Sequence, residues 1–143
     1  MSIERIESQI RIEIQQIDKL FDTYSTLLMG CKDKEPDLVE ITAIASVLQS
    51  FYNGLENIFA LIAKRIDNGT LSGEQWHKRL LSEMVKQTQK RNPVISEDLK
   101  EKLVEYMGFR HFFRHSYSFF LEWEELRRLA SPLDDVWSEV KTN

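Results

Sequence analysis

Apolar residues recur at steps of three and four along most of the chain, which is the spacing of one face of an α-helix. The first run predicts a helix from about Ser2 to Met29, and Gly30 ends it. The second run predicts a helix that Pro36 opens as a first-turn residue and that Asn68-Gly69 ends. Helices of about 30 residues would be about 45 Å long, so we expect an antiparallel hairpin with apolar surface left for a partner. The apolar positions are Ile10, Ile14, Ile17, Phe21, Tyr24 and Leu28, then Ile41, Ile44, Leu48, Phe51, Leu55, Ile58, Ile62 and Ile66.

A third helix is predicted after Ser72, which has Gln75 three residues later in the form of a capping box. The apolar face of this helix carries Trp76 and Leu80, and the helix is expected to end before Asn92-Pro93.

A fourth helix is expected to begin at Ser96, because two acidic residues follow this candidate N-cap, and to end near Ser116. The last helical segment starts at about Glu122 and is interrupted at Ser131-Pro132. Neither a strand pattern nor a repeat is visible. The expected fold is all-α, an antiparallel bundle of four to five helices that forms one domain over residues 1–143.

Composition narrows the classes of function. The net charge of -4 argues against binding nucleic acid by bulk electrostatics, so any such contact must be local. Lys86, Lys90 and Arg91 form one cluster of positive charge that could border a cleft together with Arg110 and Arg114. The single cysteine excludes an intrachain disulfide, and no apolar run approaches the roughly 18 residues that span a bilayer. We therefore expect a cytoplasmic protein that needs no membrane and no cofactor.

The segment from Gly108 to Tyr117 is where the chain looks suited to chemistry, since it holds two arginines, two of the three histidines and a tyrosine. Arginine has a planar, permanently charged fork that fits phosphate oxygens, and histidine can exchange a proton near neutral pH. Within it, Arg110, His115 and Tyr117 have the spacing Arg-x4-His-x-Tyr.

This motif, near the end of the penultimate long helix, resembles the HEPN superfamily and within it the HepT-like ribonuclease toxins. The earlier segments Tyr52 to Phe59 and Ser72 to His77 also look like that family. The resemblance implies a homodimeric, metal-independent endoribonuclease that cleaves RNA, such as tRNA or mRNA. It also implies a nucleotidyltransferase antitoxin that silences the toxin by adenylylating the motif tyrosine, here Tyr117.

The residues support this chemistry independently. Cleaving RNA without a metal requires proton transfer at the 2′-hydroxyl and at the departing 5′-oxygen, and a cation for the charged transition state. We interpret His115 as the proton-transfer group and Arg110 as the cation, with His111 and Arg114 as RNA-binding or supporting residues. Residues five apart on a helix point about 140° apart. One chain therefore does not complete the site, and a two-fold axis would bring both chains' residues around one cleft.

Each residue also has a structural interpretation. Arg110 could form an ion pair with a helix carboxylate, His115 could be a cation at a helix end, and Tyr117 could be a core residue. Glu56 and Asn53, which are polar on an apolar helix, could orient the site or face solvent.

Two further interpretations remain for this region. His111 and His115 have the spacing of a zinc-binding pair, but no third ligand is indicated, because Cys31 and His77 are remote in sequence. Phe112, Phe113, Phe119, Phe120 and Trp123 are interpreted as core or interface, with base stacking as the minor alternative.

Two other classes of function compete with a ribonuclease. The same bundle could be a non-catalytic binding module that docks a nucleotidyltransferase, or a purely structural dimerising bundle. The combination of Arg110, His115 and Tyr117 favours the enzyme, because an adaptor does not need that set.

Overall fold

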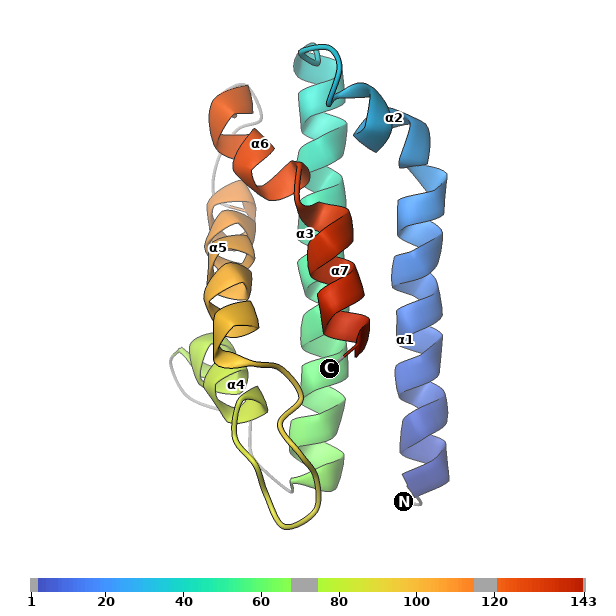
Figure 1. The fold of residues 1–143 in the computed structure, drawn as a ribbon, viewed down its shortest axis with the longest axis vertical. Coiled ribbons are helices and arrows are strands. Elements are labelled where there is room, and N and C mark those ends of the chain that lie inside the picture. The colour runs from blue at the N-terminus through green and yellow to red at the C-terminus, as the bar shows by residue number, and fades with distance from the viewer. Residues whose placement is uncertain (1–2, 68–74, 115–120, 143) are drawn as a thin grey trace.

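The computed structural model describes residues 3–67, 75–114 and 121–142 (Figure 1). Helices α1, α3, α5 and the α6–α7 pair alternate in direction, so the predicted all-α antiparallel bundle is confirmed. The described elements are α1 (Ile3–Thr23), α2 (Ser25–Gly30), α3 (Leu38–Leu61), the π-helix η1 (Ile62–Ile66), α4 (Trp76–Met84), α5 (Glu97–Arg114), α6 (Trp123–Ala130) and α7 (Leu133–Thr142).

Helix α3 lies at the centre of the bundle and packs against α1, α2, α4, α5 and α6. The predicted antiparallel hairpin of the first two long helices is present as α1 and α3 (Figure 1). The Ile17 side chain of α1 packs against α3 at Gly54, where an added Cβ would lie 2.8 Å from it. Glycine at this position therefore permits the helix contact.

The predicted end of the first helix at Gly30 is confirmed, but the predicted continuity of that helix and the predicted role of Pro36 are wrong. The first helix is interrupted at Tyr24, where the Ser25 hydroxyl donates to the Asp22 carbonyl at 3.0 Å and competes with the helical backbone pattern. Pro36 is not the first helical residue, because Asp37 is the N-cap of α3. Asp37 accepts from the Glu40 amide at 2.8 Å, and the Glu40 side chain accepts from the Asp37 amide at 2.9 Å. This capping box satisfies amides that the first turn leaves unpaired.

The start and end of α4 also differ from the prediction. Gln75 is not the third residue of a capped helix but the N-cap of α4, in the left-handed conformation with φ of 60°. Ser72 lies outside the described residues. Helix α4 ends at Met84. The Met84 carbonyl accepts hydrogen bonds from the amides of Val94 and Ile95 at 2.8 and 3.3 Å. The chain between Met84 and Ser96 is thus held to the end of α4 without continuing the helix.

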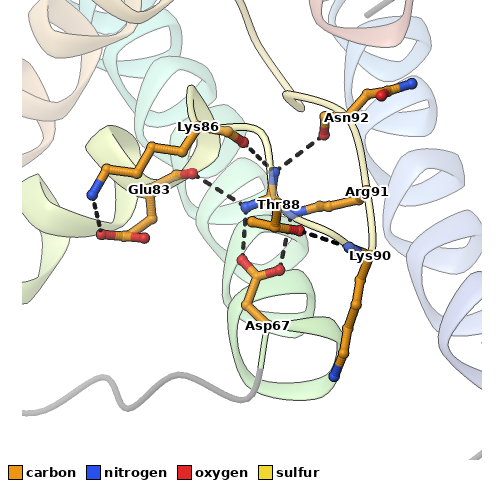
Figure 2. A network of polar contacts seen from close by, with 7 residues as sticks. All are labelled: Asp67, Glu83, Lys86, Thr88, Lys90, Arg91 and Asn92. Carbon is orange, nitrogen blue, oxygen red and sulfur yellow. Dashed lines mark hydrogen bonds and ion pairs between the residues drawn. The ribbon is translucent and has the colours of Figure 1, made fainter.

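Arg91 holds the segment between Met84 and Ser96 in place through hydrogen bonds (Figure 2). Its Nε and Nη2 atoms donate to the two carboxylate oxygens of Asp67 at 3.0 and 2.7 Å. Its fork also donates to the carbonyls of Glu83 and Lys86, at the end of α4, at 3.2 and 2.8 Å. Only 10% of the Arg91 side chain is exposed. The expectation that Arg91 borders a nucleic-acid cleft is wrong, because its donors are used inside the fold.

The predicted start of the fourth helix and the interruption of the last are both confirmed. The Ser96 hydroxyl accepts from the Leu99 amide at 3.1 Å, and α5 begins at the next residue. Helices α6 and α7 are separated at Ser131-Pro132. The buried Tyr106 hydroxyl of α5 donates to the Leu129 carbonyl of α6 at 2.7 Å. None of the helices in the described ranges is long and apolar enough to cross a membrane.

The last helix closes the bundle against the first. The Trp137 indole N–H donates to the Asp18 carboxylate at 2.8 Å, and Lys141 donates to the same oxygen at 3.1 Å. Both hydrogen bonds lower the pKa of Asp18, and the bond from Trp137 has the larger effect. The Trp137 ring also lies 6.0 Å from the Phe51 ring, edge to face. Helix α7 thereby contacts both members of the hairpin.

We predict opposite effects on stability for alanine at two helical glycines. Gly54→Ala should lower the free energy of unfolding by about 1 kcal/mol, because the clash with Ile17 exceeds the gain in helix propensity. Gly108→Ala should raise the free energy of unfolding by about 1 kcal/mol, because the added Cβ would meet no atom of another described element within 4 Å. Urea unfolding of the two variants measures both effects. Stabilisation by Gly54→Ala would contradict a tight contact between α1 and α3.

Candidate functional site

Arg110 lies on α5 and forms an ion pair with Glu56 of α3. Its Nη1 atom donates to Glu56 Oε1 at 2.5 Å, and the exposed fractions of the two side chains are 13% and 7%. Among the described residues, Glu56 is the one charged residue that is buried. A buried carboxylate needs ion-pair or hydrogen-bond partners, because water does not solvate its charge. The helix-carboxylate pair expected as the structural alternative for Arg110 is therefore present. Glu56 is buried and does not face solvent, so that interpretation is wrong. Whether Glu56 supports the site stays a prediction.

His77 is the second partner of Glu56, and sequence analysis missed it. Its Nδ1 atom lies 2.6 Å from Glu56 Oε2, so one carboxylate joins residues of α3, α4 and α5. The ring of Trp76 stacks against the His77 imidazole at a centroid distance of 3.7 Å. The available signal was Glu56 itself, because a carboxylate on an apolar helix face implies a cation or N–H group near it.

Tyr52 lies one helical turn before Glu56 and is fully buried. Among the described residues, neither the Tyr52 hydroxyl nor the buried Nε atom of Arg110 has a hydrogen-bond partner. Burial first, and then the nearby Glu56 charge, raises the pKa of Tyr52. Unpaired polar atoms beside a shared carboxylate are unusual for a purely structural cluster, since each carries a desolvation cost.

A cavity of about 350 Å³ lies beside this cluster, between the start of α4 and the second half of α5. It brings together four side chains that can be positively charged, on a protein whose net charge is -4. Such a local concentration of positive charge suits an anionic ligand. The lining residues are Gln75, His77, Lys78, Met107, Gly108, Arg110 and His111.

The remaining predicted site residues are distributed as follows. His111 is exposed and lines the cavity with Arg110. Arg114 is the last residue of α5, and its side chain lies outside what the structure describes. His115 and Tyr117 lie outside the described residues, so their roles stay predictions. Asn53 is half-buried on α3, and its role is likewise untested.

The cluster of Lys86, Lys90 and Arg91 does not belong to this cavity. These residues follow the end of α4, whereas the cavity is lined by the helix start, and a nine-residue helix is about 13 Å long. Lys86 pairs with Glu83 at 3.0 Å. The expectation that this cluster shares a cleft with Arg110 is therefore wrong for Arg91, and the cavity lining does not include the two lysines.

The aromatic residues of the motif have mixed environments. Phe112 is 44% exposed, whereas Trp123 is buried. Phe109 and Phe113 stack on each other with centroids 5.9 Å apart. Phe119 and Phe120 lie outside the described residues. A second cavity, of about 470 Å³, lies between α5 and α6 and includes Phe112 in its lining.

The two motif histidines, His111 and His115, have the spacing of a zinc-binding pair. Over the ranges 3–67, 75–114 and 121–142, no three His, Cys, Asp or Glu residues are grouped closely enough to hold a metal ion. His115 is not among these residues, so this finding does not test the His111 and His115 pair.

Comparison with known proteins identifies the family of this bundle. A family model described as HepT-like protein matches residues 43–143, which include Glu56, His77 and the whole Arg-x4-His-x-Tyr motif. The chain therefore belongs to the HepT-like family, a toxin family of the HEPN superfamily. No curated protein and no solved structure matches the chain significantly.

Membership in this family indicates a general class of function. It points to a HEPN ribonuclease toxin that acts on RNA and has a nucleotidyltransferase antitoxin as its partner. Helices α1 and α2 precede the matched region. The buried cluster and its cavity lie entirely within it.

Proposed function

We propose that this protein is a metal-independent endoribonuclease toxin that uses Arg110 and His115 to cleave RNA. The observation that carries the proposal is the cavity beside Arg110, where four potentially cationic side chains meet in a member of the HepT-like family. Arg110 is held by Glu56, so its planar fork is fixed before a phosphate arrives. Preorganised charge is the most effective way to stabilise a charged transition state.

The chemistry follows from the residue types. The 2′-hydroxyl of RNA attacks the adjacent phosphorus, and the bond to the 5′-oxygen breaks. His115 supplies proton transfer, and Arg110 stabilises the negative charge that develops on phosphate. The products are a 2′,3′-cyclic phosphate and a 5′-hydroxyl.

We further propose that the active cleft is shared by two copies of the chain. Arg110 and His115 are five residues apart, and a continued α5 would point them about 140° apart. A two-fold axis beside α5 would place both residues of each copy around one cleft. The proposed nucleotidyltransferase partner silences this cleft by adenylylating Tyr117.

The first test is cleavage of RNA in a chelator. Purified protein should cleave tRNA or mRNA in excess EDTA and leave 2′,3′-cyclic phosphate ends, because side chains perform the roles that a metal would fill. Mass spectrometry of the fragments identifies these ends. Activity that disappears in EDTA and returns with a divalent cation would contradict the mechanism. A folded protein that cleaves no RNA would favour the non-catalytic docking module.

Substitution of the two catalytic residues should lower the rate by different routes. His115→Ala should reduce it by roughly 10² to 10⁴ through lost proton transfer. Arg110→Ala should reduce it by roughly 10² to 10³. Because Arg110→Ala also removes a partner of the buried Glu56, Arg110→Lys is the matched control, which keeps a charge but not the planar fork. Single-turnover kinetics, with thermal unfolding of each variant, measure these effects.

Mixing the two alanine variants extends this test to the shared cleft. A dimer of one Arg110→Ala chain and one His115→Ala chain retains one copy of each group, so partial activity should return. Light scattering gives the assembly state of the same samples. A fully active monomer would overturn the shared cleft while leaving the roles of both residues intact.

Tyr117→Phe should separate regulation from cleavage. Adenylylation adds a negative phosphate that would compete with RNA phosphate for Arg110 and Arg114, and it adds bulk to the cleft, so activity should fall without unfolding. The Phe variant lacks the acceptor oxygen and should cleave RNA while resisting the nucleotidyltransferase and ATP. Intact-mass spectrometry detects the adduct. An adenylyl group on the Phe variant, or one on Tyr117 that leaves cleavage unchanged, would remove this residue from the account.

A further inference from the structure

His77 combines a fixed orientation with access to the cavity. Its Nδ1 atom contacts the buried Glu56 carboxylate at 2.6 Å, yet 37% of the His77 side chain is exposed. Because Nδ1 is bound to Glu56, Nε2 is the ring nitrogen available to a ligand. The stacked Trp76 ring, 3.7 Å away between centroids, restricts rotation of the imidazole. Both contacts hold the ring in one orientation beside the cavity.

The partner of Nδ1 sets which nitrogen carries the proton. An ionised carboxylate accepts hydrogen bonds and donates none, so Nδ1 bears the hydrogen that bonds Glu56. In the neutral ring, Nε2 is then a proton acceptor. When Nε2 takes a proton, the adjacent carboxylate stabilises the imidazolium that forms. A carboxylate that orients a histidine in this way is a recurrent device of general-base catalysis.

The same carboxylate places His77 and Arg110 together. Glu56 holds His77 through one oxygen and Arg110 through the other, and both residues line the cavity between α4 and α5. A phosphate bound by Arg110 would therefore lie in the cavity that His77 borders. Among the described residues, the other cavity-lining groups that carry charge or titrate are Lys78, at the start of α4, and His111 on α5. Tyr52 does not line the cavity, but it is buried on α3 near Glu56 and Arg110.

We propose that His77 is a further catalytic residue, the general base of RNA cleavage, and that Glu56 is its positioning residue. The inference rests on the proposed ribonuclease function and adds a role within the same site. The proton of the 2′-hydroxyl passes to Nε2 of His77 while the 2′-oxygen bonds to phosphorus. The bond from phosphorus to the 5′-oxygen breaks, and the 5′-oxygen receives a proton from His115. His77 then returns its proton to water, and His115 regains one.

The test compares two substitutions of His77 in single-turnover cleavage of RNA at saturating protein. His77→Gln keeps a side-chain amide that can donate to Glu56 but cannot exchange a proton. We expect this variant to fold and to lose cleavage by roughly 10² to 10⁴. His77→Ala should lose as much, and added imidazole should restore part of its rate by entering the space beside Glu56. Arg110→Ala, measured in parallel, should gain nothing from imidazole.

Glu56→Gln tests the positioning role. It replaces the carboxylate by a neutral amide of the same shape, so His77 loses the charge that fixes its tautomer and stabilises its protonated form. We expect the maximal rate to fall by about 10- to 100-fold, with a smaller effect on the RNA concentration that half-saturates the protein. The cleavage rate of Glu56→Gln should still decline at acid pH, as that of the unsubstituted protein does. The cleavage rate of His77→Gln should show no such decline.

The outcomes separate this inference from the function on which it rests. A wild-type protein that cleaves no RNA overturns both. If His115→Ala is inactive and His77→Gln cleaves at the wild-type rate, only the role of His77 is overturned. A folded His77→Ala variant that loses activity and does not respond to imidazole overturns proton transfer and makes His77 a structural residue. Partial rescue together with the altered pH profile supports the proposal.

Discussion

One buried carboxylate determines how the central part of this bundle can be arranged. Glu56 lies on the buried face of α3 and is 6% exposed, so its charge cannot be left to water. Removing a partner from a buried ion pair typically costs about 3–5 kcal/mol, which is a large share of the stability of a domain this size. Arg110 and His77 must both remain close to it, and their helices are thereby fixed against α3. Arg110 and His77, which are both proposed for chemistry, are thus also residues that the fold cannot easily release.

The hydrophobic pattern predicted the bundle because its long helices each bury one continuous face. The antiparallel order, the start of α5 after Ser96 and the interruption at Ser131-Pro132 all follow from local signals that the structure retains. The errors in the helices are the missed interruption at Tyr24 and the wrong boundaries at the start of α3 and at both ends of α4. Asp37 rather than Pro36 begins α3, because its carboxylate binds the amide of Glu40. A proline that precedes an N-cap and a proline in the first turn give almost the same sequence pattern.

The candidate site was predictable only where its parts lie near one another in the chain. The motif indicates Arg110, and Glu56 stands out as a polar residue on an apolar helix. Their pairing joins positions 54 residues apart, and the contact of Glu56 with His77 spans 21 residues. Spacing within one helix contains no information about such contacts. The same limit explains the wrong prediction for Arg91. Its partner Asp67 is 24 residues away, and the ion pair gives Arg91 a structural contact where the sequence suggests a basic patch.

The contact between the first and last helices determines when the fold can be completed. Asp18 and Trp137 are 119 residues apart, and the hydrogen bond between them holds α7 against α1. A chain made from its N-terminus can pair α1 with α3 early, because that contact closes a short loop. The aromatic cluster of Phe21, Phe51 and Trp137 has to wait until the last helix has left the ribosome. Until then, the parts of Phe21 and Phe51 that Trp137 covers stay open to solvent, although the hairpin that carries them has already formed.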